Sequence, residues 1–240
     1  MNKTTTASVT FILGVGAGWI IQGRHWDVFV TSYIPALATL LAAFYGAKYA
    51  FQFQKEKEIE DTAKRNLVNV NAAIFTLSRM ANQLFIYQRD VIAPARESPV
   101  RLLELRPTLE IEKELIELDI QSIYFILETE DRNLLSEVII EEERYRVTID
   151  AINTRSRLHL QEVQPLLEQA GFVSGNFYDP VEIEGYLGSR LYSTLQQYTD
   201  QLVIHVDSTL ISTKDVANRL KNAIKILYPN EKVITFTPPS

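Results

Sequence analysis

The chain of 240 residues contains no cysteine and only three histidines. The absence of cysteine excludes a disulfide framework and any metal site with thiolate ligands. A basic excess is also missing, because the formal net charge is −6, whereas a general nucleic-acid binder is basic over its surface. With 46% apolar residues, the chain is not disordered throughout.

Catalytic and nucleotide-binding motifs are missing as well. The patterns HExxH, GxSxG, GxxxxGK[ST] and DxDxDG do not occur. His159 and His205 lie in register with apolar helical stripes, so we interpret them as packed histidines with one hydrogen-bond partner rather than catalytic bases or metal ligands. Neither has the preceding arginine of certain helical RNases or the Glu-x-x-His pair of di-metal bundles. We therefore predict a non-enzymatic protein without cofactor or metal.

Charge is absent from two stretches near the N-terminus. Residues 28–47 are 20 consecutive uncharged residues, which as a helix cover about 30 Å, the thickness of a bilayer core. Residues 7–22 are a shorter uncharged stretch, for which a cleaved signal peptide is the competing interpretation. The apolar run continues through Trp19, Ile20 and Ile21, which is poor for a cleavage site. We therefore predict a transmembrane helical hairpin over residues 1–54.

Small residues recur in both apolar stretches. A nucleotide-binding glycine loop would need a βαβ context that is not visible around residues 14–18. The spacing of four is instead that of closely packed membrane helices, within the hairpin or between copies. The predicted packing residues are Gly14, Gly18, Ala38, Ala42 and Gly46.

Basic residues follow the second stretch in greater number than they occur in the turn between the two. Lys48, Lys55 and Lys57 stand just after it, whereas the turn has only Arg24 and the ambiguous His25. The positive-inside rule then places the N-terminus and the large C-terminal part in the cytoplasm, with the hairpin in the inner membrane.

The cytoplasmic part is predicted to be all-α. No glycine or proline occurs between Gly46 and Pro94, so the second span should continue as a long juxtamembrane helix to about Ile92. An apolar stripe spaced by alternating threes and fours marks an assembly seam, and added aromatics favour bundle packing over an isolated dimeric coil. The seam residues are Leu67, Val70, Ile74, Leu77 and Leu84.

Periodicity and punctuation divide the rest of the chain. Residues 93–108 read as a proline-marked linker, and helices are expected over 110–128, 133–170, 180–209 and 212–227. The boundary between the last two helices, at residues 209–212, rests on Ser212 and Asp215, which resemble a capping box. The cytoplasmic helical bundle should therefore occupy residues 55–228, and residues 229–240 should form an extended C-terminal tail.

Charged residues are segregated along the chain. Residues 110–145 carry twelve acidic and three basic residues, while the last predicted helix is basic. These charges are either solvated faces or docking surfaces for a second copy, a partner or anionic lipid, with direct nucleic-acid binding ranked last because no aromatic platform is present. The docking residues considered are Glu141, Glu142, Glu143, Lys214, Arg219, Lys221 and Lys225.

The hairpin over residues 7–47, followed by the charged helix over residues 48–92, resembles the two-transmembrane effectors of bacterial antiphage systems, including those associated with retrons. The resemblance is one of architecture across the whole chain. It implies an oligomeric protein that a cytoplasmic sensor, or the sensor's nucleic-acid complex, holds silent and that permeabilises or depolarises the membrane once released. The alternative function is a passive membrane anchor or scaffold whose helical domain docks a cytoplasmic partner.

Overall fold

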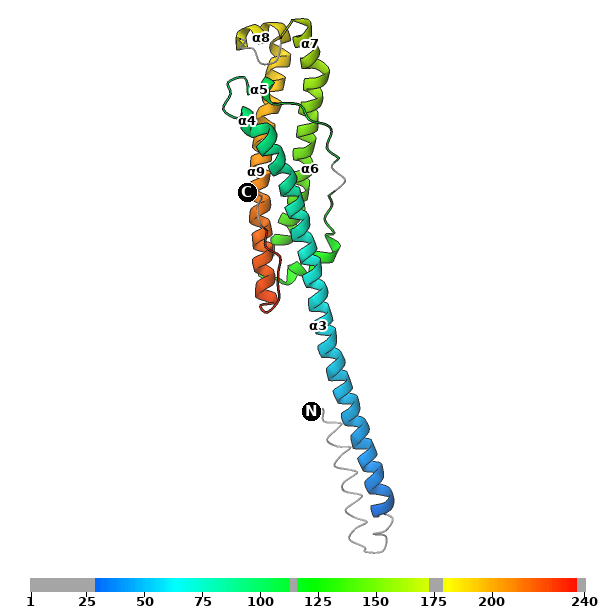
Figure 1. Cartoon of the computed structure of the whole chain (residues 1–240). Coiled ribbons are helices and arrows are strands. Elements are labelled where there is room, and N and C mark those ends of the chain that lie inside the picture. The colour runs from blue at the N-terminus through cyan, green and yellow to red at the C-terminus, as the bar shows by residue number, and fades with distance from the viewer. Residues whose placement is uncertain (1–28, 113–115, 173–178, 237–240) are drawn as a thin grey trace. The chain divides into compact units, whose positions relative to one another are not determined.

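The computed structural model describes residues 29–112, 116–172 and 179–236 (Figure 1). Within these residues the regular secondary structure is entirely helical. The chain divides into two compact units, Met1–Thr62 and Ala63–Ser240. The predicted all-α class is therefore confirmed for the described part of the chain.

The longest element is α3, which spans Ile34–Tyr87 and follows the π-helical turn η1 (Phe29–Tyr33). It continues through η2 (Gln88–Ile92) into α4 (Ala93–Ala95). The prediction of an unbroken helix to about Ile92 is confirmed. It follows from the lack of glycine and proline after Gly46, since these two residues are the strongest helix breakers.

Among the residues that the structure describes, three π-helical turns each end two residues before a proline. They are η1 before Pro35, η2 before Pro94 and η5 (His159–Val163) before Pro165. Proline has no N–H to donate and its ring clashes with the carbonyl four residues earlier, so a wider turn lets the helix continue past it. The helix predicted over residues 133–170 is thus distorted near Pro165, and the helical run ends just before Gly171, whose φ of 78° is left-handed.

The second unit is a bundle of the last part of α3, α6 (Leu134–Leu158) and α9 (Ser189–Leu227). In Figure 1, α6 and α9 lie side by side. They are antiparallel, because Glu141 bonds Thr213 whereas Thr148, further along α6, bonds Thr209. On α3, Gln83 accepts a hydrogen bond from the Tyr145 hydroxyl at 2.6 Å.

Two apolar clusters form the interior of the second unit. The larger is built mainly from α3, α6 and α9 and includes Leu77, Ile149 and Leu220. The smaller includes Leu102 of α5 (Arg101–Glu104) and Ile183 of α8 (Pro180–Leu187), with α7 (Gln164–Gln169) nearby in the chain. The bundle core is therefore interrupted along its length.

The predicted helix over residues 110–128 is wrong. Of its described residues, only Gln121–Glu128 is helical, as the 3₁₀ helix η4, and residues 116–119 are irregular. Ile116 and Leu118 are buried while the residues after each are exposed, which is the period of two of an extended chain. Earlier in the chain, Asn153 of α6 accepts a hydrogen bond from the N–H of Ile111 and donates one to the Ile111 carbonyl oxygen.

The predicted boundary between helices at residues 209–212 is also wrong. α9 is continuous through it, and Ser212 donates to Glu141 and to the Thr209 carbonyl instead of capping a helix. The actual break lies earlier, at Gly188, whose φ of 74° and ψ of 144° suit glycine alone. The end of α9 at Leu227, before Tyr228 and a proline, is as predicted.

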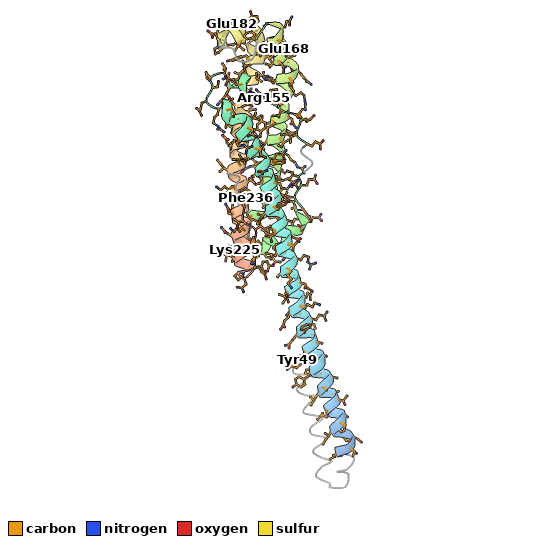
Figure 2. All side chains as sticks on the ribbon, viewed as in Figure 1. Tyr49, Arg155, Glu168, Glu182, Lys225 and Phe236 are labelled. Carbon is orange, nitrogen blue, oxygen red and sulfur yellow. The ribbon has the colours of Figure 1, made fainter. Side chains whose placement is uncertain are left out.

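The described part of the tail, residues 229–236, begins with a turn, contains no helix or strand, and packs on the bundle. Its Phe236 side chain is buried, and the N–H of Ile234 donates to the Asn71 side chain of α3. Figure 2 shows Phe236 against the bundle.

Candidate functional site: a buried polar layer and an exposed apolar helix

A layer of polar side chains separates the two apolar clusters. Along α6 and η5, Ile152 belongs to the larger cluster and Val163 to the smaller, and Arg155 and His159 lie between them. Along α9, Thr199 lies between Leu195 of the smaller cluster and Leu202 of the larger. Tyr87 belongs to the larger cluster and interacts electrostatically with Arg155. We call Tyr87, Arg155, His159 and Thr199 the polar layer.

Arg155 is the most unusual member of the polar layer. Its side chain has no exposed surface, and Figure 2 shows its place in the bundle. Its Nη2 donates to the carbonyl oxygen of Leu102 at 2.8 Å, which ties α6 to α5, but Nε and Nη1 have no hydrogen-bond partner. Among the described residues, no carboxylate pairs with it. A buried guanidinium without a counter-charge is costly, because burial removes its hydration.

The other three members also have unpartnered polar atoms. The Tyr87 hydroxyl, His159 Nδ1 and Thr199 Oγ1 are all buried without a hydrogen-bond partner among the described residues. Most buried polar atoms in folded proteins are hydrogen-bonded. Five such atoms on four residues, counting the two of Arg155, therefore mark the polar layer as the least satisfied part of the described interior.

Arg155 carries the only charge in the polar layer at neutral pH. Burial lowers the pKa of Arg155 to about 10, so the guanidinium remains protonated at neutral pH. Burial and the nearby Arg155 charge lower the pKa of His159 to about 4, and burial raises the pKa of Tyr87 to about 12. His159 and Tyr87 are thus neutral and the layer carries one positive charge.

The lowered pKa of His159 predicts a loss of stability in acid. The unfolded chain binds a proton at His159 near pH 6.5, whereas the folded chain does so only near pH 4. Between these values the unfolded state holds more protons, so the free energy of unfolding falls as pH falls, by about 3 kcal/mol in full. We expect His159→Gln to remove this pH-dependent part of the free energy of unfolding. Chemical unfolding at a series of pH values across that range measures it.

The His205→Gln variant, which leaves His159 in place, serves as the control and should keep the parent's pH dependence. If His159→Gln and the parent lose stability in parallel on acidification, the assignment of this component to His159 is wrong.

The second feature is the exposed apolar surface at the start of α3. Among the described residues, the run Val30–Ala95 is the one helix long and apolar enough to span a membrane, and its apolar window is not buried at all. Figure 2 shows Tyr49 projecting from this part of α3. The large side chains exposed here are Val30, Tyr33, Ile34, Leu37, Leu40, Leu41, Phe44, Tyr45, Tyr49, Phe51 and Phe53.

The predicted membrane-packing residues fall partly within this surface. Ala38, Ala42 and Gly46 are exposed on α3, and a Cβ added at Gly46 would meet no atom within 4 Å. Their surface is therefore open to a helix or to lipid. Gly14 and Gly18 lie outside the described residues.

The predicted assembly seam lies inside the chain's own bundle. Val70, Ile74, Leu77 and Leu84 are buried in the larger apolar cluster, and Leu67 packs against that cluster. In this arrangement their partners are α6, α9 and their neighbours, so a second copy would meet other residues of α3.

The acidic docking residues differ in their surroundings. Glu141 is only 2% exposed and accepts hydrogen bonds from Ser212 and Thr213, so it joins α6 to α9 and offers no surface to a partner. Glu142 accepts from Arg146 one turn later, at 2.6 Å. Glu143 is exposed.

The basic docking residues differ in the same way. Arg219 bonds Asp131 and Glu137, which raises its pKa and ties α9 to the start of α6. Lys221 donates to Thr235 of the tail. Lys214 and Lys225 are exposed, so the structure does not gather the seven docking residues into one surface.

Sequence reasoning missed the polar layer except for His159. A signal was present, because Ile152, Arg155, His159 and Val163 are spaced by three and four, which places Arg155 on the apolar face of its helix. No family model matches the chain, and no curated protein or solved structure resembles it significantly.

Proposed function

We infer that the protein is a non-enzymatic inner-membrane effector, in which a cytoplasmic helical bundle controls a membrane hairpin that permeabilises or depolarises the bilayer. The observation that carries this proposal is the exposed apolar surface of α3, of which Leu40 and Phe44 are 61% and 57% exposed. Contiguous apolar surface of this extent is unfavourable in water and is normally covered by lipid or protein.

The course of α3 supports control of the hairpin by the bundle. The helix that presents Leu40 to its surroundings also contributes Val70, Leu77 and Leu84 to the bundle core. A partner that changes the packing of those core residues would act on the same helix that enters the bilayer. The partners proposed are therefore lipid, further copies of the chain and a cytoplasmic sensor protein.

Replacement of residues 1–54 by an unrelated two-helix anchor tests the proposal. An effector loses its action on membrane potential, measured with a potential-sensitive dye after induced expression, while the replaced protein stays in the membrane. If induced expression of the parent leaves the potential unchanged and the parent is monomeric in detergent, the effector proposal is lost.

The second candidate function is a scaffold whose hairpin only localises the bundle. One observation favours it: the seam residues Val70, Ile74 and Leu77 already pack within one chain, which leaves them without a role between copies. A scaffold keeps its activity when residues 1–54 are replaced by the unrelated anchor, so the same experiment separates the two functions.

A further inference from the structure

We propose that copies of this chain associate through two different faces of the bundle: the outward face of α3 in one copy packs on the outward face of α6 in the next. The inference rests on the proposed function in one respect, because chains anchored in one membrane stand the same way up.

The outward face of α3 carries a second stripe with the spacing of a helix seam. It lies opposite the buried residues of α3, alternates steps of three and four, and is exposed throughout. Three large apolar side chains of the stripe, Val68, Phe75 and Ile86, are 65%, 58% and 43% exposed. The members of this α3 face are Arg65, Val68, Ala72, Phe75, Arg79, Asn82 and Ile86.

The outward face of α6 has the same spacing. Ile140 and Val147 on this face are large apolar side chains that are 41% and 52% exposed. The members of the α6 face are Ser136, Ile140, Glu143, Val147, Asp150, Thr154 and Arg157, all of them exposed. Two helices of the bundle therefore keep apolar side chains in the solvent along a seam that a further helix could cover.

Charge selects which faces meet. Residues 63–88 contain three basic residues and no acidic one, whereas Glu143 lies in the middle of the α6 face. The arginines beside Glu143, Arg144 and Arg146, are already paired with glutamates. Among the described residues, neither Arg79 nor Glu143 forms an ion pair. Contact between two α3 faces or two α6 faces would bring like charges together, so α3 against α6 is favoured.

The two helices run in the same direction within the bundle (Figure 1). α6 is antiparallel to α9, and so is α3. Asn66 of α3 bonds Tyr228 just beyond the end of α9, whereas Gln88, later in the chain, bonds Asp207 near the middle of α9. Copies that stand the same way up therefore present parallel α3 and α6 faces to each other.

The facing groups also lie at matching heights. The hydrogen bond from the Tyr145 hydroxyl to Gln83 fixes the level of α6 against α3. Counted from this bond at 1.5 Å per residue, Arg79 and Glu143 differ in height by about 3 Å. The same count brings two apolar pairs to within one helical turn of each other: Ile86 with Val147, and Phe75 with Ile140.

The symmetry of such a contact follows from these heights. Rotation about an axis parallel to the helices leaves every residue at its own height, so it places Arg79 of one copy opposite Glu143 of the next. Because the contact uses different faces, each added copy leaves one α3 face and one α6 face open until a ring closes.

Disulfide cross-linking in membranes tests the contact. Arg79→Cys and Glu143→Cys chains with different tags are co-expressed and oxidised, and the natural sequence contributes no cysteine. Arg65→Cys replaces Arg79→Cys as the matched control, because it removes an exposed arginine of the same face about 21 Å away along the helix. We expect a dimer with both tags, at least about tenfold more abundant for Arg79→Cys than for Arg65→Cys, since a disulfide needs close β-carbons.

Two results would overturn the proposal. One is an equal yield of the two-tag dimer with Arg65→Cys and with Arg79→Cys. The other is a predominance of dimers between two Arg79→Cys chains, which would show that two α3 faces meet.

Exchange of the two charges tests the pairing itself. Arg79→Glu alone and Glu143→Arg alone should each weaken association of the full chain in detergent about tenfold, because each brings like charges together. The chain with both changes should recover most of the loss, as measured by mass photometry over a range of concentrations. A double variant no better than the single ones would contradict the pairing.

Two controls complete this experiment. Both residues are exposed, so circular dichroism should show that every variant is folded. In dilute detergent single copies prevail, so unfolding measured there has no contribution from the contact.

The membrane potential of the cross-linked cells separates this contact from the proposed function. Depolarisation without the two-tag dimer removes the contact and leaves the effector function standing. The two-tag dimer without depolarisation supports the contact and removes the effector function instead.

Discussion

A cysteine placed at Leu40 will react with a water-soluble maleimide at least about tenfold more slowly in membranes than a cysteine placed at Ile59. The two side chains are matched, since both are 61% exposed on α3. Any difference in rate must therefore come from what surrounds α3. In hydrocarbon the thiol cannot ionise and the reagent cannot enter, whereas Ile59 stands among charged residues expected to lie in water.

Background labelling of the chain is absent, because the natural sequence contains no cysteine and each variant therefore has a single reactive thiol. Labelling after denaturation gives the total thiol and serves as the control for each variant. In inside-out vesicles Ile59→Cys should react, and in intact cells it should not, which tests the cytoplasmic side predicted from the lysines after the span. Equal rates for Leu40→Cys and Ile59→Cys would show that this part of α3 is not in a bilayer.

The long helices could be predicted from sequence because their signals are local. The lack of breakers after Gly46, the effect of Pro165 and the glycine at Gly171 depend on backbone chemistry that any context preserves. Where local and tertiary preferences differ, prediction failed. Residues 116–119 are helix-compatible in composition, but Ile116 and Leu118 are both buried only if the chain is extended.

The capping motif failed for a related reason. Ser212 and Asp215 have the spacing of a helix start, yet α9 continues because Thr209 and Thr213 on either side are buried against α6. The tertiary packing of α9 thus overrides a local preference worth about 1 kcal/mol.

The polar layer was hard to predict because α6 is rich in charged residues. Between Glu141 and Arg157 nearly every turn of the helix carries an acidic or a basic side chain. From the sequence alone, Arg155 is therefore predicted to be another solvated charge. Only the register with Ile152 and Val163 distinguishes it. Tyr87 and Thr199 come from helices far away in the chain, so their meeting with Arg155 depends on how the bundle folds.

Replacing Glu141 by alanine should lower the free energy of unfolding by about 3 kcal/mol. The carboxylate is 2% exposed, and its Oε2 accepts from Ser212 at 2.7 Å and from Thr213 at 2.9 Å, while Oε1 accepts from Arg144 at 3.0 Å. Thr213 is itself buried, so its hydroxyl would lose its acceptor. Thermal and chemical unfolding followed by far-UV circular dichroism measure the change.

Glu143→Ala is the matched control, because it removes the same side chain from an exposed position two residues along α6. It should change the free energy of unfolding by no more than about 0.5 kcal/mol. Glu141→Gln retains the shape and one acceptor oxygen, so we expect a smaller loss of about 1 kcal/mol. The two substitutions change helix propensity equally, so any difference between them comes from the buried hydrogen bonds of Glu141. Equal losses of unfolding free energy for Glu141→Ala and Glu143→Ala would therefore contradict these hydrogen bonds.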